Sequence, residues 1–174
     1  MLRLWKALEI LGLSLWLGGM FGFGAITAPV LFSTPGLSQT LAGTVAGKAI
    51  SRVDLLGIGL GVVILVALVM AGRQRPARLW RLAPVLVMIG LAAANLTYVR
   101  GRMAAIRDQI GRPLEEVAVT DPLRAEYDRW HRISANLWLA NAAVGTATLL
   151  WASLENGGTG GGRGEPLVLR PRIR

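Results

Sequence analysis

The sequence contains no cysteine and only one histidine, and these two scarcities exclude several kinds of functional site. Without cysteine the chain can form neither a disulfide nor a thiolate metal site. The methionines are scattered, with no Met-x-x-Met or Met-His spacing, so they offer no thioether site for a soft metal. No nucleophile-base pair or phosphate loop with a recognised spacing is present. We expect neither an enzyme nor a bound metal or cofactor.

Long parts of the chain contain almost no charged residues and consist mainly of apolar ones. Four apolar stretches cover residues 8–32, 55–71, 82–99 and 133–154. Each is close to the ~20 residues that cross the hydrocarbon layer of a bilayer as a helix, where a charged side chain is costly. We therefore expect an all-α fold, an integral membrane four-helix bundle with short interfacial helices, formed by residues 1–154. Residues 155–174 are rich in glycine and arginine, which predicts a flexible tail.

The connection before the second apolar stretch is expected to be helical. Residues 37–54 are rich in small side chains, and Ser51 and Asp54 have the spacing of a capping box. Asp54 could instead be an intramembrane site for a proton or a cation. Capping, together with neutralisation by Lys48 and Arg52, is the favoured interpretation.

Two further helices are predicted near the last apolar stretch. Residues 101–111 place their apolar side chains on one face, which suits a short helix lying in the membrane interface. Asp121 followed by Pro122 is the signature of a helix start. This helix should continue through Tyr127 and His131 into the fourth span.

The chain is strongly basic, with a net charge of +9. No nucleic-acid recognition module is present, so we expect anionic lipid headgroups rather than nucleic acid as the partner of these charges. Residues 73–81 carry four arginines directly between two spans. By the positive-inside rule, this turn and both termini should be cytoplasmic. The arginine-rich, lysine-poor composition is typical of GC-rich bacterial genomes and predicts an inner-membrane protein.

Small residues recur at helical spacing within the first two spans. This seam consists of Ser14, Gly18, Gly22, Ala25 and Pro29 in the first span, and of Gly57 and Gly61 in the second. Because lipid provides little hydrophobic drive between helices, small side chains favour association through close backbone approach. The seams are expected to pack inside the bundle, and a homodimer face is the alternative.

Polar residues within the spans are the candidates for a site. His131, Ser134 and Asn141 share one face of the fourth span, and Asn95 lies in the third. Because unpaired polar groups are costly in hydrocarbon, we expect this face to turn inward. Hydrogen bonding between helices is the favoured role, and a polar ligand or ion site is the alternative. His131 as a haem or metal ligand is the weakest interpretation.

Several of these residues also carry a family resemblance, over roughly residues 5–152. The motif residues are Trp16, Gly18, Gly19, Gly22, Pro29, Phe32, Tyr127, Trp130, His131 and Ser134. In this pattern the chain resembles the transmembrane protein 205-like family, a four-helix membrane domain of unassigned activity. The resemblance implies four helices and does not imply an enzyme. For the eukaryotic namesake it also implies a link to platinum drugs and metal stress, for which this chain lacks soft-metal ligands.

Two classes of function are open at this point. We favour a non-enzymatic membrane protein that acts as an accessory, assembly or scaffold component, either as a homo-oligomer or with other membrane subunits. The alternative is a small carrier or binding protein for an ion, a lipid or a hydrophobic metabolite, using the polar face around His131. A cavity beside His131 would favour the alternative, whereas a packed core with an exposed small-residue face would favour the accessory role.

Overall fold

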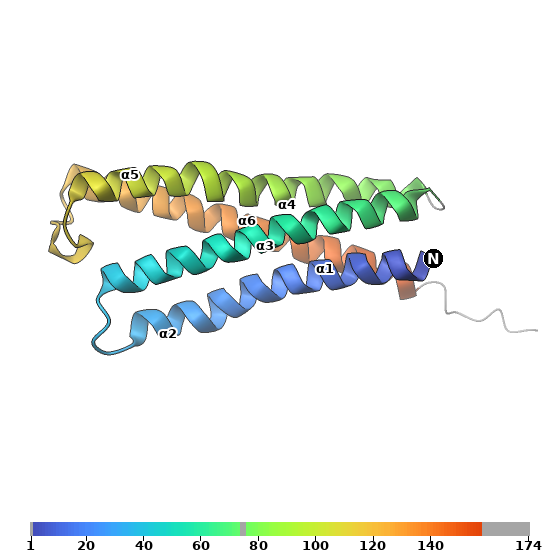
Figure 1. Cartoon of the computed structure of the whole chain (residues 1–174), viewed down its shortest axis with the longest axis horizontal. Helices are drawn as coiled ribbons and strands as arrows, with labels where there is room; N and C mark the ends of the chain where they lie inside the picture. The colour runs from blue at the N-terminus through green and yellow to red at the C-terminus, as the bar shows by residue number, and fades with distance from the viewer. Residues whose placement is uncertain (1, 74–75, 158–174) are drawn as a thin grey trace, which may run out of the picture.

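Long antiparallel helices form the whole of the described structure (Figure 1). The computed structural model describes residues 2–73 and 76–157, and no strand occurs in these ranges. The elements in chain order are α1 (Leu2–Gly22), η1 (Phe23–Thr27), α2 (Ala28–Ser33), α3 (Gln39–Gly72), η2 (Pro76–Arg81), α4 (Leu82–Ala94), η3 (Asn95–Val99), α5 (Arg100–Ile110), η4 (Leu114–Glu116) and α6 (Pro122–Gly157). The predicted all-α bundle is confirmed.

Four helical stretches are long and apolar enough to cross a membrane, as in a multi-pass membrane protein. They are Arg3–Ser33, Gln39–Gly72, Leu79–Ile110 and Pro122–Leu154. At 31 to 34 residues each, they are about 46 to 51 Å long and so exceed the hydrocarbon layer. The start of α1 and the end of α6 lie at the same end of the bundle (Figure 1). The predicted tail lies outside the described residues from residue 158 onward, and α6 continues to Gly157, past the expected limit at residue 154.

The second helix is continuous from Gln39, so the predicted helix before the second span is confirmed and merges with that span. Its start is capped by Ser38, whose hydroxyl accepts a hydrogen bond from the Leu41 amide at 3.2 Å. The predicted capping box is wrong. Ser51 donates to the Gly47 carbonyl within the helix, and the Asp54 side chain is buried in the bundle.

The helix predicted to lie in the membrane interface instead continues the third span as α5 (Figure 1). The reason is the π-helical turn η3, in which the Arg100 amide donates to the Asn95 carbonyl and the helix is widened without being interrupted. The helix ends at Gly111, whose φ of +66° is easily adopted only by glycine. The predicted start of the fourth helix is confirmed, because the Asp121 carboxylate accepts from the Leu123 amide at 2.8 Å.

Close packing fills the half of the bundle nearest the termini. The core cluster consists of Leu13, Trp16, Met20, Ile64, Leu68, Val85, Met88 and Ala92. The Trp16 indole lies against Gly57, where any Cβ would overlap it, and a Cβ on Gly61 would lie 2.7 Å from Ile89. Gly57 and Gly61 are therefore packing residues, as predicted.

The small-residue seam of α1 does not pack inside the bundle, which corrects the favoured interpretation. Ser14, Gly18 and Ala25 are exposed, and a Cβ added to Gly18 or Gly22 would meet no described atom within 4 Å. The cause is that Leu13, Trp16 and Met20 form the inward face of α1, and the seam lies on the opposite face. The alternative of a homodimer face stays a prediction.

A buried ion pair joins the first and third spans near the termini. The Arg81 guanidinium donates to the Glu9 carboxylate at 2.5 Å, and the two side chains are 1% and 3% exposed. Removing one partner of such a pair leaves an uncompensated buried charge. Sequence patterning does not reveal this pairing, because the two residues are 72 positions apart.

The contact between Trp16 and α3 can be tested by adding a single methyl group. Gly57→Ala should lower the stability of the bundle in detergent, because overpacking costs about 1–3 kcal/mol. Gly59→Ala is the matched control, since its Cβ meets no described atom within 4 Å. Thermal unfolding measured by circular dichroism should show a lower Tm for Gly57→Ala alone. Equal Tm values for the two variants would contradict the packing described above.

Candidate functional site

A pocket of about 690 Å³ lies between the helices in the half of the bundle away from the termini. It is bounded by η1 and α2 on one side, by α3 and α5 on another, and by the first half of α6. Its main apolar residues are Phe23, Ala28, Phe32, Ile50, Met103, Ala104, Ala135, Trp138 and Leu139. Its polar and charged residues are Thr44, Lys48, Ser51, Arg100, Arg107, Asp108, Tyr127, His131 and Ser134.

A π-helical turn in the first span contributes to the pocket wall. In η1 the Ala28 amide donates to the Phe23 carbonyl, one residue further back than in an α-helix. Pro29, which lacks an amide hydrogen and disturbs an α-helix, follows directly. Phe23 from this turn packs edge-on against Trp138 of α6, with 5.9 Å between the ring centroids. A Cβ on Gly24 would lie 3.1 Å from the same indole, so the missing side chain lets the two helices approach here.

A chain of buried side-chain hydrogen bonds joins three helices beside the pocket. The Ser134 hydroxyl of α6 donates to the side-chain Oδ1 of Asn95 at 2.7 Å, and Asn95 Nδ2 donates to Asp54 Oδ2 at 2.8 Å. Asp54 and Asn95 are each 1% exposed. Asp54 Oδ1 and Trp138 Nε1 are buried without a hydrogen-bond partner among the described residues. The chain therefore leads from the pocket surface at Ser134 to a buried carboxylate with spare acceptor capacity.

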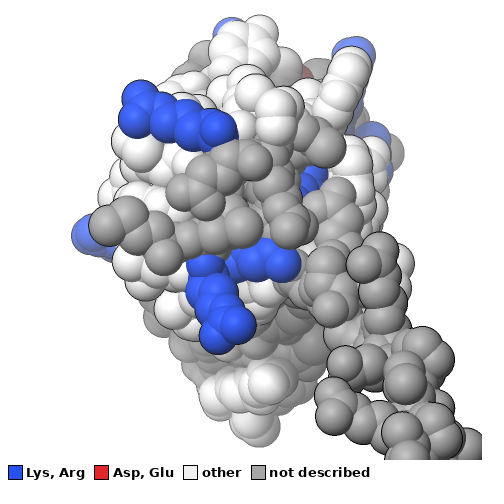
Figure 2. Space-filling view, turned by 90° about the vertical axis from the view of Figure 1, so that its right-hand side faces the viewer, with Lys and Arg blue, Asp and Glu red and all other residues white. Residues whose placement is uncertain are grey.

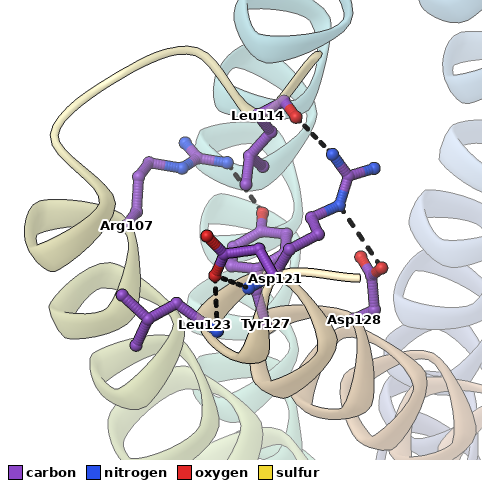
Figure 3. Close-up of polar contacts among 7 residues, drawn as sticks. Arg107, Leu114, Asp121, Leu123, Tyr127 and Asp128 are labelled. Atoms are coloured by element: carbon purple, nitrogen blue, oxygen red, sulfur yellow. Dashed lines mark hydrogen bonds and ion pairs between the residues drawn. The ribbon is translucent and has the colours of Figure 1, made fainter. Parts of the chain in front are cut away.

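Arg100 and Arg107 of α5 are half-buried and form a cationic wall of the pocket. Arg107 donates to Thr44 Oγ1 at 2.9 Å. It also donates to the Tyr127 hydroxyl at 2.7 Å (Figure 3). Its guanidinium also lies over the Tyr127 ring, 5.4 Å from the centroid. The Arg100 guanidinium lies against Gly47, where a Cβ would be 2.6 Å from Nη2. The absence of a side chain at Gly47 thus leaves room for the Arg100 guanidinium.

Contacts between the connecting segments hold this end of the bundle together. The Glu115 carboxylate accepts from the Thr40 amide at 3.0 Å and from its hydroxyl at 2.5 Å. These hydrogen bonds hold the pKa of the Glu115 carboxyl below its ordinary value, the side-chain bond from Thr40 being the main cause. Arg124 donates to the Leu114 carbonyl and to Asp128, beside the pair of Arg107 and Tyr127 (Figure 3).

The predicted polar residues do not all come together. Ser134 and Asn95 are bonded to each other, and Ser134 lines the pocket. His131 also lines the pocket, but it is exposed and makes no hydrogen bond to another described residue. Asn141 is 1% exposed, lies outside the pocket lining, and has no partner for its Oδ1 among the described residues. Of the four residues predicted to form a ligand site, only Ser134 and His131 line the pocket, and Asn95 is bonded to Ser134.

The family-motif residues fall into separate places. Trp16 belongs to the core, whereas Phe32 and Tyr127 line the pocket. Trp130 lies outside the pocket and packs edge-on against Tyr98 with 5.6 Å between centroids. Gly19 lies beside α3, since a Cβ there would be 3.7 Å from Val53.

Sequence reasoning missed the cationic wall, although the spacing of its residues contains a usable signal. Pocket residues recur at intervals of seven on three helices, namely Thr44 and Ser51, Arg100 and Arg107, and Tyr127 and Ser134. Seven residues make about two turns, so each pair shares one face of its helix. A polar pair on each of three helices predicts a common polar site.

Residues 11–112, more than half of the chain, match the family described as "Domain of unknown function (DUF4149)". The chain belongs to the DUF4149 family. The DUF4149 match covers the helices from Leu11 to the end of α5 and stops before α6. Tyr127, His131 and Ser134 therefore lie outside it. Neither a curated protein nor a solved structure matches the chain.

The hydrogen-bond chain beside the pocket makes a prediction about stability. Asn95→Ala should destabilise the bundle by about 1–3 kcal/mol, because Asp54 Oδ2 loses its donor and Ser134 its acceptor. Asp54→Asn should reduce this cost, since a neutral amide is cheaper to leave unpaired than a carboxylate. Unfolding in detergent of the two single variants and the double variant measures the coupling. Additive effects would show that Asn95 and Asp54 do not depend on each other.

Proposed function

We propose that this protein is a non-enzymatic membrane protein that binds an amphiphilic small molecule in the pocket between η1, α3, α5 and α6. The pocket itself is the observation that carries the proposal. Its volume of about 690 Å³ lies within the range of ligand sites, roughly 300–1,000 Å³. Its lining combines apolar side chains with a comparable set of polar and charged ones, which suits a molecule that has an apolar and a polar part.

The position of the pocket along the helices agrees with such a ligand. Trp138 and Leu139 of α6 line it toward the middle of the spans, and Arg107 of α5 lies near the end of its span. A molecule entering from the bilayer would keep its apolar part in hydrocarbon and its polar part at the interface. Exchange with the surrounding lipid then requires no passage through water.

We further propose that the termini lie in the cytoplasm of a bacterial cell and that the pocket opens at the outer side of the inner membrane. The end of the bundle that carries the termini exposes basic side chains, among them Arg3 and Arg73, and almost no acidic ones in its described part (Figure 2). This asymmetry supports the orientation through the positive-inside rule. The proposal includes the resemblance to the transmembrane protein 205-like family. It does not include metal binding.

Blocking the pocket tests the proposed function. Ala104 lines the pocket, whereas its neighbour Ala105 does not, and both are exposed. Ala104→Phe should reduce saturable binding of a photoactivatable long-chain amphiphile by about tenfold or more, because the ring occupies pocket volume. Ala105→Phe should bind like the unmodified protein. Labelling with equal yield in both variants, or labelling that excess unlabelled amphiphile does not reduce, would reject the pocket as the binding site.

The accessory or assembly role is a second candidate, and one observation favours it. Ser14, Gly18 and Ala25 lie on an outward face of the first span, with Gly22 beside them, and a Cβ added to Gly18 or Gly22 would meet no described atom within 4 Å. Small side chains on a lipid-facing helix permit close approach by a helix of another subunit or of a second copy. Binding an amphiphile and assembling through α1 are compatible, since the pocket and the seam lie on different faces.

The seam can be tested independently of the pocket. Gly22→Leu should leave the unfolding of the isolated chain unchanged, because a Cβ at this position has no described atom within 4 Å, but should abolish an oligomer formed through α1. Gly90→Leu on α4 is the matched control, because it also meets no described atom within 4 Å. Crosslinking in native membranes measures assembly. The accessory role through α1 fails if Gly22→Leu and Gly90→Leu crosslink alike.

A further inference from the structure

We propose that the pocket selects amphiphiles with an anionic headgroup, a carboxylate or a phosphate, and that Arg100 and Arg107 bind this group. The inference rests on the proposed function, since it names the class of ligand for the same pocket.

The charges that line the pocket are unbalanced. Lys48, Arg100 and Arg107 are cationic, and Asp108 is the one acidic residue among the described residues of the lining. Lys48 and Asp108 are exposed to solvent, whereas the two arginines are half-buried. Within residues 2–73 and 76–157, neither arginine forms an ion pair with a carboxylate. Since partly buried cations are costly without a counter-charge, an anion in the pocket would be stabilised by both.

The buried carboxylate of Asp54 does not replace such an anion. Its Oδ2 is occupied by Asn95, and the Arg100 guanidinium acts on it only through its charge, beyond ion-pair distance. Asp54 therefore offsets part of the positive potential but accepts no hydrogen bond from Arg100. We expect a ligand headgroup to accept the hydrogen bonds that Arg100 can donate.

Arg107 is held in place for recognition. Thr44 accepts a hydrogen bond from Nη1 of Arg107, and Tyr127 accepts one from Nη2. These two bonds fix the plane of the guanidinium. Its Nε is buried without a partner among the described residues. A guanidinium has five N–H donors in a planar fork that matches carboxylate and phosphate oxygens. An arginine whose position is fixed by neutral partners keeps its full charge and its remaining donors for an anion.

The apolar residues point to the other half of the ligand. Phe23 and Phe32 come from the η1–α2 segment, and Trp138 and Leu139 from α6. They follow the helices from the level of the arginines toward the middle of the spans. An acyl chain lying along them has the same direction as the neighbouring lipid chains, while its head reaches α5.

Binding of three probes with saturated 16-carbon chains to the full chain in nanodiscs of zwitterionic lipid tests the inference. The probes are a fatty acid, the primary alcohol of the same length, and a phosphatidylglycerol with two such chains. We expect the fatty acid, the phosphatidylglycerol or both to bind about tenfold or more tightly than the alcohol, as charge-assisted hydrogen bonds predict. Arg107→Gln and Arg100→Gln should remove this preference and leave binding of the alcohol unchanged, which also shows that the variants are folded. Arg102→Gln is the control of equal charge change, because Arg102 is exposed and pairs with Glu126 at 3.4 Å.

Each outcome decides between the two proposals. If the alcohol and the anionic probes bind unmodified protein equally, the anion selectivity is wrong and the amphiphile pocket stands. If no probe binds saturably, both proposals fail. If Arg102→Gln lowers the preference as much as Arg107→Gln does, overall charge rather than the pocket attracts the anion, and the assignment to Arg100 and Arg107 is wrong. Preference for the fatty acid alone identifies a free single-chain anion as the ligand, and preference for phosphatidylglycerol alone identifies a membrane lipid; either supports the inference.

Discussion

The carboxylate of Asp54, buried at the centre of a helical bundle, constrains how three of the long helices are placed. In hydrocarbon no water is available to solvate it, so its hydrogen-bond donor must come from another helix. Asn95 supplies that donor from η3, and Ser134 of α6 donates in turn to Asn95. The π-helical turn that begins at Asn95 belongs to the same arrangement, because it changes which side chains of the third span face inward. Rotating any of these helices would leave a buried polar group unpaired.

The two halves of the bundle, which lie on either side of this hydrogen-bond chain, are packed differently. Toward the termini, Gly57 and Gly61 allow Trp16 to lie directly against α3, and the interior is filled. Toward the other end, the polar and aromatic side chains around Trp138 and Arg107 are held apart by their own hydrogen bonds and ring contacts, and a pocket remains. A bundle that spans a membrane can carry such a pocket because the filled half alone supplies the close packing that holds helices together in lipid.

The arginines also differ between the two halves of the bundle. Among the described arginines near the termini, Arg3 and Arg73 face outward and Arg81 is paired with a carboxylate. Arg100 and Arg107 are instead directed into the pocket, where Thr44 and Tyr127 hold one of them without neutralising it. On the proposals made above, the first group of arginines orients the protein in the membrane and the second group recognises a ligand. The net charge of the chain alone does not distinguish the two.

The sequence by itself determined the number of long helices, the helix start at Asp121 and the role of Gly57 and Gly61, because hydropathy, capping and side-chain size are local properties. It also placed Ser134 and Asn95 among the polar residues that seek partners. It did not determine which face of α1 packs inward, so the seam at Gly18 and Gly22 was assigned to the wrong side. Only the tertiary structure decided the partners of Asp54 and Glu9 and the inward direction of Arg100 and Arg107, because residues far apart along the chain meet only when the rotation of every helix is fixed.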